Sequence, residues 1–121
     1  MKLLLALALT LAAHAETRAV TWIGKFSDAG CATPRAKAGL FTGVNPDCAK
    51  KCLEKGVTPV LIVEKEKLLV TVKGYPSVIA DLGYPVEVQG AYDEAAKTLA
   101  VTKVARIGDY EGPSCARPKK K

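Results

Sequence analysis

Cysteines are the residues of this 121-residue chain best suited to do chemistry. The chain has four of them, namely Cys31, Cys48, Cys52 and Cys115. Its only histidine, His14, lies in an apolar N-terminal segment. If that segment is removed, no imidazole remains for Ser-His-Asp or Cys-His catalysis. We therefore expect any chemistry of this chain to involve its thiols, and we do not expect an enzyme.

The N-terminal residues 1–15 have the pattern of a secretory signal peptide. Lys2 precedes an apolar run over residues 3–13, and small residues flank His14 up to Ala15. The run is about half the ~20 residues that a membrane-spanning helix needs. We expect cleavage after Ala15 and a secreted or periplasmic protein with no transmembrane segment; an uncleaved anchor is the alternative.

The spacing of the cysteines limits how they can pair. In an oxidising compartment, four cysteines predict two disulfides. Residues 45–56 have a helix pattern, with Asn45 as the cap and Gly56 as the stop, so Cys48 and Cys52 share one helix face. Their Cβ atoms would lie about 5–6 Å apart, whereas a disulfide needs about 3.5–4.5 Å. We expect Cys31 to pair with one of them and Cys115 with the other, in an order that the sequence leaves open.

A metal or redox site is the competing interpretation of the same thiols. The Cys-x-x-x-Cys spacing of Cys48 and Cys52 suits copper(I), which soft thiolates select. A thioredoxin-like motif has two residues between its cysteines rather than three, and a four-thiolate zinc site needs all four cysteines reduced. We expect no metal or cofactor, with Cys48 and Cys52 as the alternative copper or redox site.

Alternating apolar residues predict a mainly β protein. The segments expected to form five short strands are residues 20–26, 59–63, 68–72, 85–92 and 98–106. A short helix carries Cys48 and Cys52, and one helical turn over residues 78–82 precedes the fourth strand. This order predicts a small OB-like β-barrel, with an open β-meander as the competing architecture.

The length of the chain predicts one domain with two appendages. The domain is a single OB-like unit over residues 16–110. The appendages are a signal peptide over residues 1–15 and a basic tail over residues 111–121 that Cys115 tethers. Residues 32–44 contain Pro34 and Gly39 without a clear period and are predicted to form a loop. Asp28 is expected to cap or turn the end of the first strand.

Two cysteine segments resemble a family of proteins. Residues 24–31 and 48–56 fit the pattern G-x-h-x-D-x-x-C … C-x-x-x-C-h-x-x-G, where h is apolar. This pattern resembles an uncharacterised family of small exported bacterial proteins, a domain of unknown function, over residues 20–107. The resemblance implies export and an OB-like β half, and no activity; Cys115 lies outside the pattern. The strand order is also similar to that of periplasmic OB-fold proteins.

The functional hypothesis is an exported binding or adaptor domain, expected to be a monomer. Its partner would be a protein or another envelope component. The expected binding surface combines the 32–44 loop with Trp22, Lys25, Phe41 and Tyr92, because loops on a rigid scaffold often carry function. Nucleic acid is not expected, since aromatic residues make up only 6% of the chain and export places it away from most nucleic acid.

Overall fold

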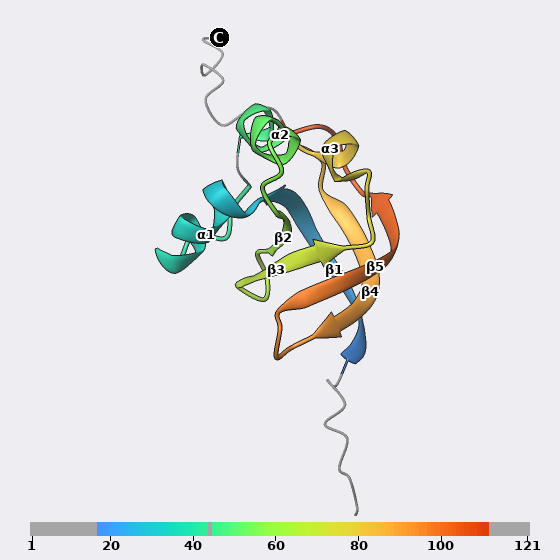
Figure 1. The fold of residues 1–121 in the computed structure, drawn as a ribbon. Helices are drawn as coiled ribbons and strands as arrows, with labels where there is room; N and C mark the ends of the chain where they lie inside the picture. The colour runs from blue at the N-terminus through green and yellow to red at the C-terminus, as the bar shows by residue number, and fades with distance from the viewer. Residues whose placement is uncertain (1–16, 44, 112–121) are drawn as a thin grey trace, which may run out of the picture.

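A computed structural model describes residues 17–43 and 45–111 (Figure 1). The elements, in chain order, are β1 (Thr17–Asp28), α1 (Ala29–Lys37), α2 (Pro46–Glu54), β2 (Pro59–Val63), β3 (Leu68–Lys73), α3 (Val78–Asp81), β4 (Val86–Asp93) and β5 (Thr98–Arg106). The strands close into a barrel in the order β1-β2-β3-β5-β4. None of the helices in the described residues is long and apolar enough to cross a membrane.

The pairing of the strands confirms the predicted OB-like barrel. All neighbours are antiparallel except β3 and β5, which pair in parallel from Thr71 with Thr98 to Lys73 with Ala100. β1 is longer than predicted and serves two neighbours. It pairs with β4 up to Gly24 and with β2 from Lys25 onward. The strand must therefore bend sharply at Gly24 to close the barrel.

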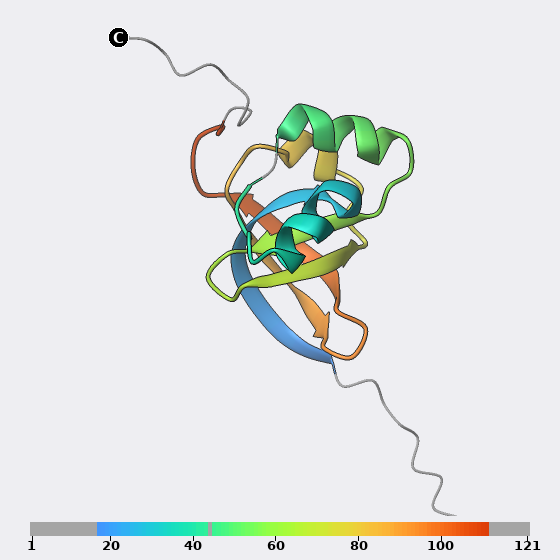
Figure 2. The same ribbon diagram turned by 90° about the vertical axis from the view of Figure 1, so that its left-hand side faces the viewer.

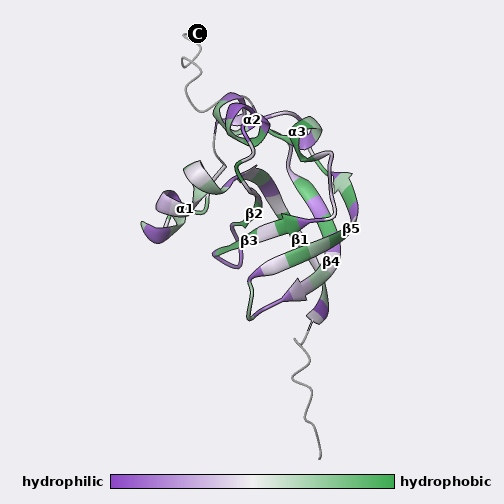
Figure 3. Cartoon of the chain, in the orientation of Figure 1, coloured by the Kyte–Doolittle hydropathy of each residue, from purple (hydrophilic) through white to green (hydrophobic). Residues whose placement is uncertain are grey.

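Side chains of alternate residues fill the barrel. β4 alternates strictly between buried and half-buried positions, as its sequence predicts, and places Val86, Val88 and Tyr92 in the core. β2 is different because both of its faces are covered. Leu61 points into the barrel, whereas Val60 belongs to a second small cluster on the outside. Figure 3 shows this strand as largely hydrophobic.

Helix α1 replaces the first part of the loop predicted over residues 32–44, whereas residues 38–43 lie in no helix or strand, as predicted. The helix runs from Ala29 to Lys37 and carries Pro34 in its interior. Pro34 lacks an N–H group and so removes one intrahelical hydrogen bond, but the helix gains burial of Ala32 against the outer face of β2. Asp28 ends β1, where the sequence predicted a cap or turn, and its side chain starts the unpredicted helix as the N-cap.

The other helices agree with the predictions. α2 begins after Asn45, whose side chain accepts a hydrogen bond from the Asp47 amide, and ends before Gly56, which has a φ of +90°. α3 is the single turn expected before β4. Figure 2 shows α1 in front of the barrel wall and α2 across one end of the barrel. The β1–β2 connection thus carries two helices on the outside of the barrel.

Candidate functional site

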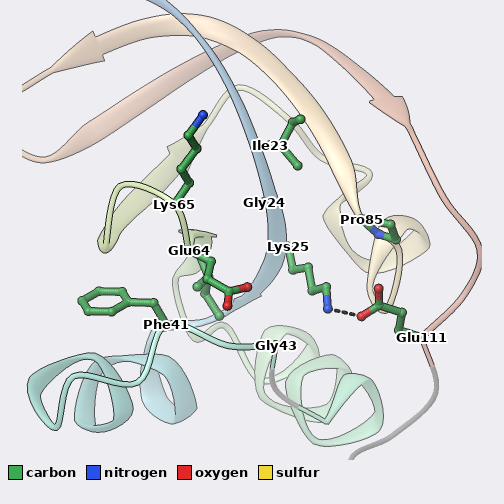
Figure 4. Close-up of a pocket in the computed structure, with 10 residues that line it drawn as sticks. Ile23, Gly24, Lys25, Phe41, Gly43, Glu64, Lys65, Pro85 and Glu111 are labelled. Carbon is green, nitrogen blue, oxygen red and sulfur yellow. Dashed lines mark hydrogen bonds and ion pairs between the residues drawn. The ribbon is translucent and has the colours of Figure 1, made fainter.

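A groove of about 530 Å³ lies beside the bend of β1 (Figure 4). Its size is within the range of small-molecule and peptide sites, about 300–1,000 Å³. Five segments of the chain line it: β1, the β1–β2 connection, the end of β2 with its following turn, the segment just before β4, and the segment after β5. The lining residues are Ile23, Gly24, Lys25, Phe41, Gly43, Ile62, Glu64, Lys65, Pro85 and Glu111.

The alternation of β1 explains why Ile23 and Lys25 face the groove. Trp22 and Phe26 pack with the barrel core. Ile23 and Lys25 lie on the opposite face of the strand and therefore point outward. Ile23 is 58% exposed, which is high for an isoleucine on a central strand. The outward face of β1 therefore presents an apolar side chain to solvent within a concave surface.

The C-terminal segment forms one wall of the groove. After β5, the Ile107 amide donates to the Pro85 carbonyl at 3.0 Å, and the Glu111 amide donates to the Gly83 carbonyl at 2.6 Å. Lys25 Nζ then donates to the Glu111 carboxylate. Figure 4 shows Phe41 and Glu111 on opposite sides of Lys25. Contacts with the barrel thus continue through Glu111, one residue beyond the expected domain end.

The charges of the groove balance. Two lysines and two glutamates line it, namely Lys25, Lys65, Glu64 and Glu111. The remaining surface is largely apolar, contributed by Ile23, Ile62, Phe41 and Pro85. A polyanion such as nucleic acid favours a surface with excess positive charge. The composition of this groove instead suits an apolar ligand with polar groups at its edges.

The structure separates the four residues expected to form a binding surface. Lys25 and Phe41 both line the groove. Trp22 and Tyr92 pack edge to face, with ring centroids 4.8 Å apart, and Tyr92 is only 3% exposed. Their rings belong to the core side of the barrel wall. Sequence reasoning did not single out Ile23, although its position opposite Trp22 in the alternation indicated an outward side chain.

Phe41 also borders a second cleft, of about 420 Å³, between α1 and β3. Thr71 and Lys97 lie at this cleft, together with the α1 residues Ala36 and Lys37. Phe41 packs against the outer cluster that contains Ala32 and is half-buried. Its ring therefore supports the β1–β2 connection from the outside and does not fill the barrel.

The structure brings two of the four cysteines close together. Cys31 in α1, Cys52 in α2 and Asp28 place their sulfur and carboxylate oxygen atoms within 4.8 Å of one another. Cys48 lies one helical turn earlier in α2 and is exposed. The three are thiols, and Cys115 lies outside the described residues. Of the two partners left open for Cys31, Cys52 is the one that the structure groups with it; the disulfide remains a prediction.

Asp28 is the most buried charged residue beside these thiols. It has no exposed surface, and its Oδ2 accepts a hydrogen bond from the Cys31 amide at 3.0 Å. Its Oδ1 is buried and accepts no hydrogen bond from any residue that the structure describes. Burial, and next the neighbouring Asp28 carboxylate, raises the pKa of the Cys31 thiol to about 11.

Comparisons with protein-family models, curated proteins and solved structures found no match to this chain. The fold and the site therefore define a structural class: an OB-like barrel whose β1–β2 connection carries two helices, with a groove beside β1 and a thiol–carboxylate cluster where that connection leaves the barrel.

Proposed function

We propose that this protein is an exported, non-enzymatic binding domain that holds an apolar segment of a partner protein in the groove beside β1. The observation that carries the proposal is Ile23, an isoleucine that is 58% exposed in a concave surface of about 530 Å³. Exposed apolar side chains gathered in a concavity and rimmed by polar groups are typical of binding sites.

Four of the ten residues that line the groove lie on the paired strands β1 and β2. Ile23 and Lys25 lie on β1 and Ile62 lies on β2, and Lys25 pairs with Ile62 across the two strands. A site on paired strands keeps its shape before the ligand arrives, which reduces the entropic cost of binding. Phe41 and Gly43 come from the β1–β2 connection, and the other lining residues outside the strands are Glu64, Lys65, Pro85 and Glu111. These six residues are the more adaptable part of the surface.

The ion pair between Lys25 and Glu111 gives the groove a polar edge. The side chains are 29% and 55% exposed, so water competes with the pair. Such exposed pairs contribute little to stability, about 0–1 kcal/mol, and can exchange partners at low cost. A peptide in the groove can therefore direct its own backbone or charged groups to Lys25 and Glu111.

The alternative function, copper binding or redox chemistry at Cys48 and Cys52, has weaker support. Cys48 is exposed, and the close group of ligand atoms joins Cys52 to Cys31 and Asp28 instead.

Substitution of Ile23 tests the binding proposal. Peptides are first selected from a random displayed library on the purified protein, and their dissociation constants are measured by fluorescence anisotropy. Ile23→Asp should weaken binding about tenfold or more, because an apolar contact worth about 1.5–3 kcal/mol is lost and a charge enters the groove. Since Ile23 is mostly exposed, the thermal midpoint should change little.

Ile79→Asp provides the matched control. Ile79 is also exposed, at 37%, but it lies on α3 and does not line the groove. The Ile79→Asp substitution should leave the dissociation constants within about twofold of those of the unmodified protein, as expected for a surface change away from the contact. Equal losses in the two variants, or peptides that bind Ile23→Asp as tightly as the unmodified protein, would contradict the proposal.

A further inference from the structure

Three potential metal ligands converge where the β1–β2 connection leaves the barrel. Asp28 is the last residue of β1, Cys31 lies in the first turn of α1, and Cys52 lies in the last turns of α2. One ligand atom from each lies within 4.8 Å of the other two. The packing of α1 and α2 thus brings together residues that are up to 24 positions apart in the chain.

The buried carboxylate points to a ligand at this place. Asp28 has no exposed surface, yet its Oδ1 has no partner among the described residues. Buried carboxylate oxygens are nearly always hydrogen-bonded or bound to a cation, because leaving them unpaired is costly. The helix cap uses only Oδ2, so capping α1 does not account for the second oxygen.

A disulfide between Cys31 and Cys52 would not solve this problem. It would use the two sulfur atoms and supply no donor to the Asp28 carboxylate, whereas a cation between the three side chains would bind both sulfur atoms and a carboxylate oxygen. The buried carboxylate therefore supports a cation at this site when the two thiols are reduced.

The donor set identifies the cation. Thiolates select soft or borderline ions such as copper(I) and zinc, whereas carboxylates suit harder ions; zinc commonly accepts both types of ligand. Around a tetrahedral zinc ion, with bonds of about 2.0–2.3 Å, ligand atoms lie about 3.3–3.8 Å apart. The present separations, all within 4.8 Å, exceed these values by at most about 1–1.5 Å, which side-chain rotation can supply.

We propose that Asp28, Cys31 and Cys52 of the reduced protein bind one zinc ion. Binding releases the two thiol protons to solvent, and the two thiolates and the carboxylate then offset the charge of the ion. Three protein ligands leave the fourth position of a tetrahedral ion to water or another small ligand. The ion ties the end of β1 to both helices and so fixes the base of the connection that carries Phe41.

Zinc titration of the reduced full-length protein tests this site. The protein is stripped with a chelator, kept reduced and titrated with zinc chloride against a chromophoric competitor. One zinc ion per chain is expected. Cys31→Ser and Cys52→Ser should each weaken zinc binding about 100-fold or more, and Asp28→Asn about 10- to 100-fold. Asparagine is a good N-cap, so the last variant removes the anionic ligand while it keeps the start of α1.

Cys48→Ser is the matched control, since Cys48 lies on the same helix but outside the cluster. Zinc affinity should stay within about threefold of that of the unmodified protein. Cobalt(II) adds a direct readout: thiolate-to-cobalt charge-transfer absorption should appear in the unmodified protein and in Cys48→Ser, and should weaken in the Cys31 and Cys52 variants.

Three results would overturn the zinc site. The first is that the unmodified protein binds zinc no more tightly than a protein lacking both Cys31 and Cys52. The second is that Cys48→Ser weakens binding as much as Cys52→Ser. The third is that protein whose thiols are blocked at the moment of lysis contains a Cys31–Cys52 disulfide and no zinc.

Discussion

Replacing Gly24 with alanine should lower the free energy of unfolding by about 3 kcal/mol. Gly24 is the last β1 residue paired with β4, opposite Val86, and the next residue, Lys25, pairs with Ile62 of β2. A Cβ atom at Gly24 would overlap the Ile62 carbonyl oxygen and lie 3.1 Å from its carbonyl carbon. Both atoms belong to the backbone of a paired strand, so they cannot move without opening the barrel.

Gly39→Ala is the control for the Gly24 substitution. Gly39 has a φ of +83°, and a Cβ atom there would meet nothing within 4 Å. Its replacement should cost only the left-handed backbone penalty, about 1 kcal/mol. Urea unfolding of both variants measures the difference, and a Gly24→Ala protein no less stable than Gly39→Ala would contradict the closure of the barrel at this residue.

In the reduced, metal-free protein, Cys31 should react with iodoacetamide about 100-fold more slowly at pH 8 than an ordinary thiol. Its pKa is raised from an ordinary value of 9.0 to about 11, first by burial and next by the Asp28 carboxylate. Each pKa unit lowers the reactive thiolate fraction about tenfold at a pH below both values. Between pH 9 and 11, the folded protein therefore keeps the Cys31 thiol protonated, whereas the unfolded chain loses this proton.

The pH profile of the reaction separates this effect from simple steric protection. The rate at Cys31, followed by peptide mass spectrometry, should keep rising through pH 9 and level off only near 11. Asp28→Asn should shift that midpoint to lower pH. The raised pKa also means that the free energy of unfolding falls as the pH rises from 9 to 11. A rate that is low but levels off near pH 9 would show that access alone limits the reaction.

The sequence was sufficient to predict the strands because their apolar alternation is determined by local burial. β4 and β5 lie close to their predicted limits, and the Asn45 and Gly56 signals located α2. α1 was missed because Pro34 and Gly39 are typical of loops, while its buried face consists only of small residues. The spacing of Ala29, Ala32 and Ala36, after the Asp28 cap, was the available helical signal.

The candidate sites depended on contacts that sequence cannot supply. Lys25 and Phe41 were chosen for their residue types, but their proximity to Glu111 depends on the chain returning past Pro85 after β5. Likewise, the spacing left open whether Cys48 or Cys52 is the partner of Cys31, and the packing of α1 against α2 groups Cys52 with Cys31 and Asp28. Long-range packing, rather than local pattern, determines both sites.

The most direct test of the binding proposal is the set of backbone-amide chemical shifts that a selected peptide changes in the isotope-labelled protein. If the groove binds the peptide, the largest chemical-shift changes will occur around it, at Ile23, Lys25, Gly43 and Glu111. Changes centred instead on Thr71 and Lys97, in the cleft between α1 and β3, would contradict the binding proposal.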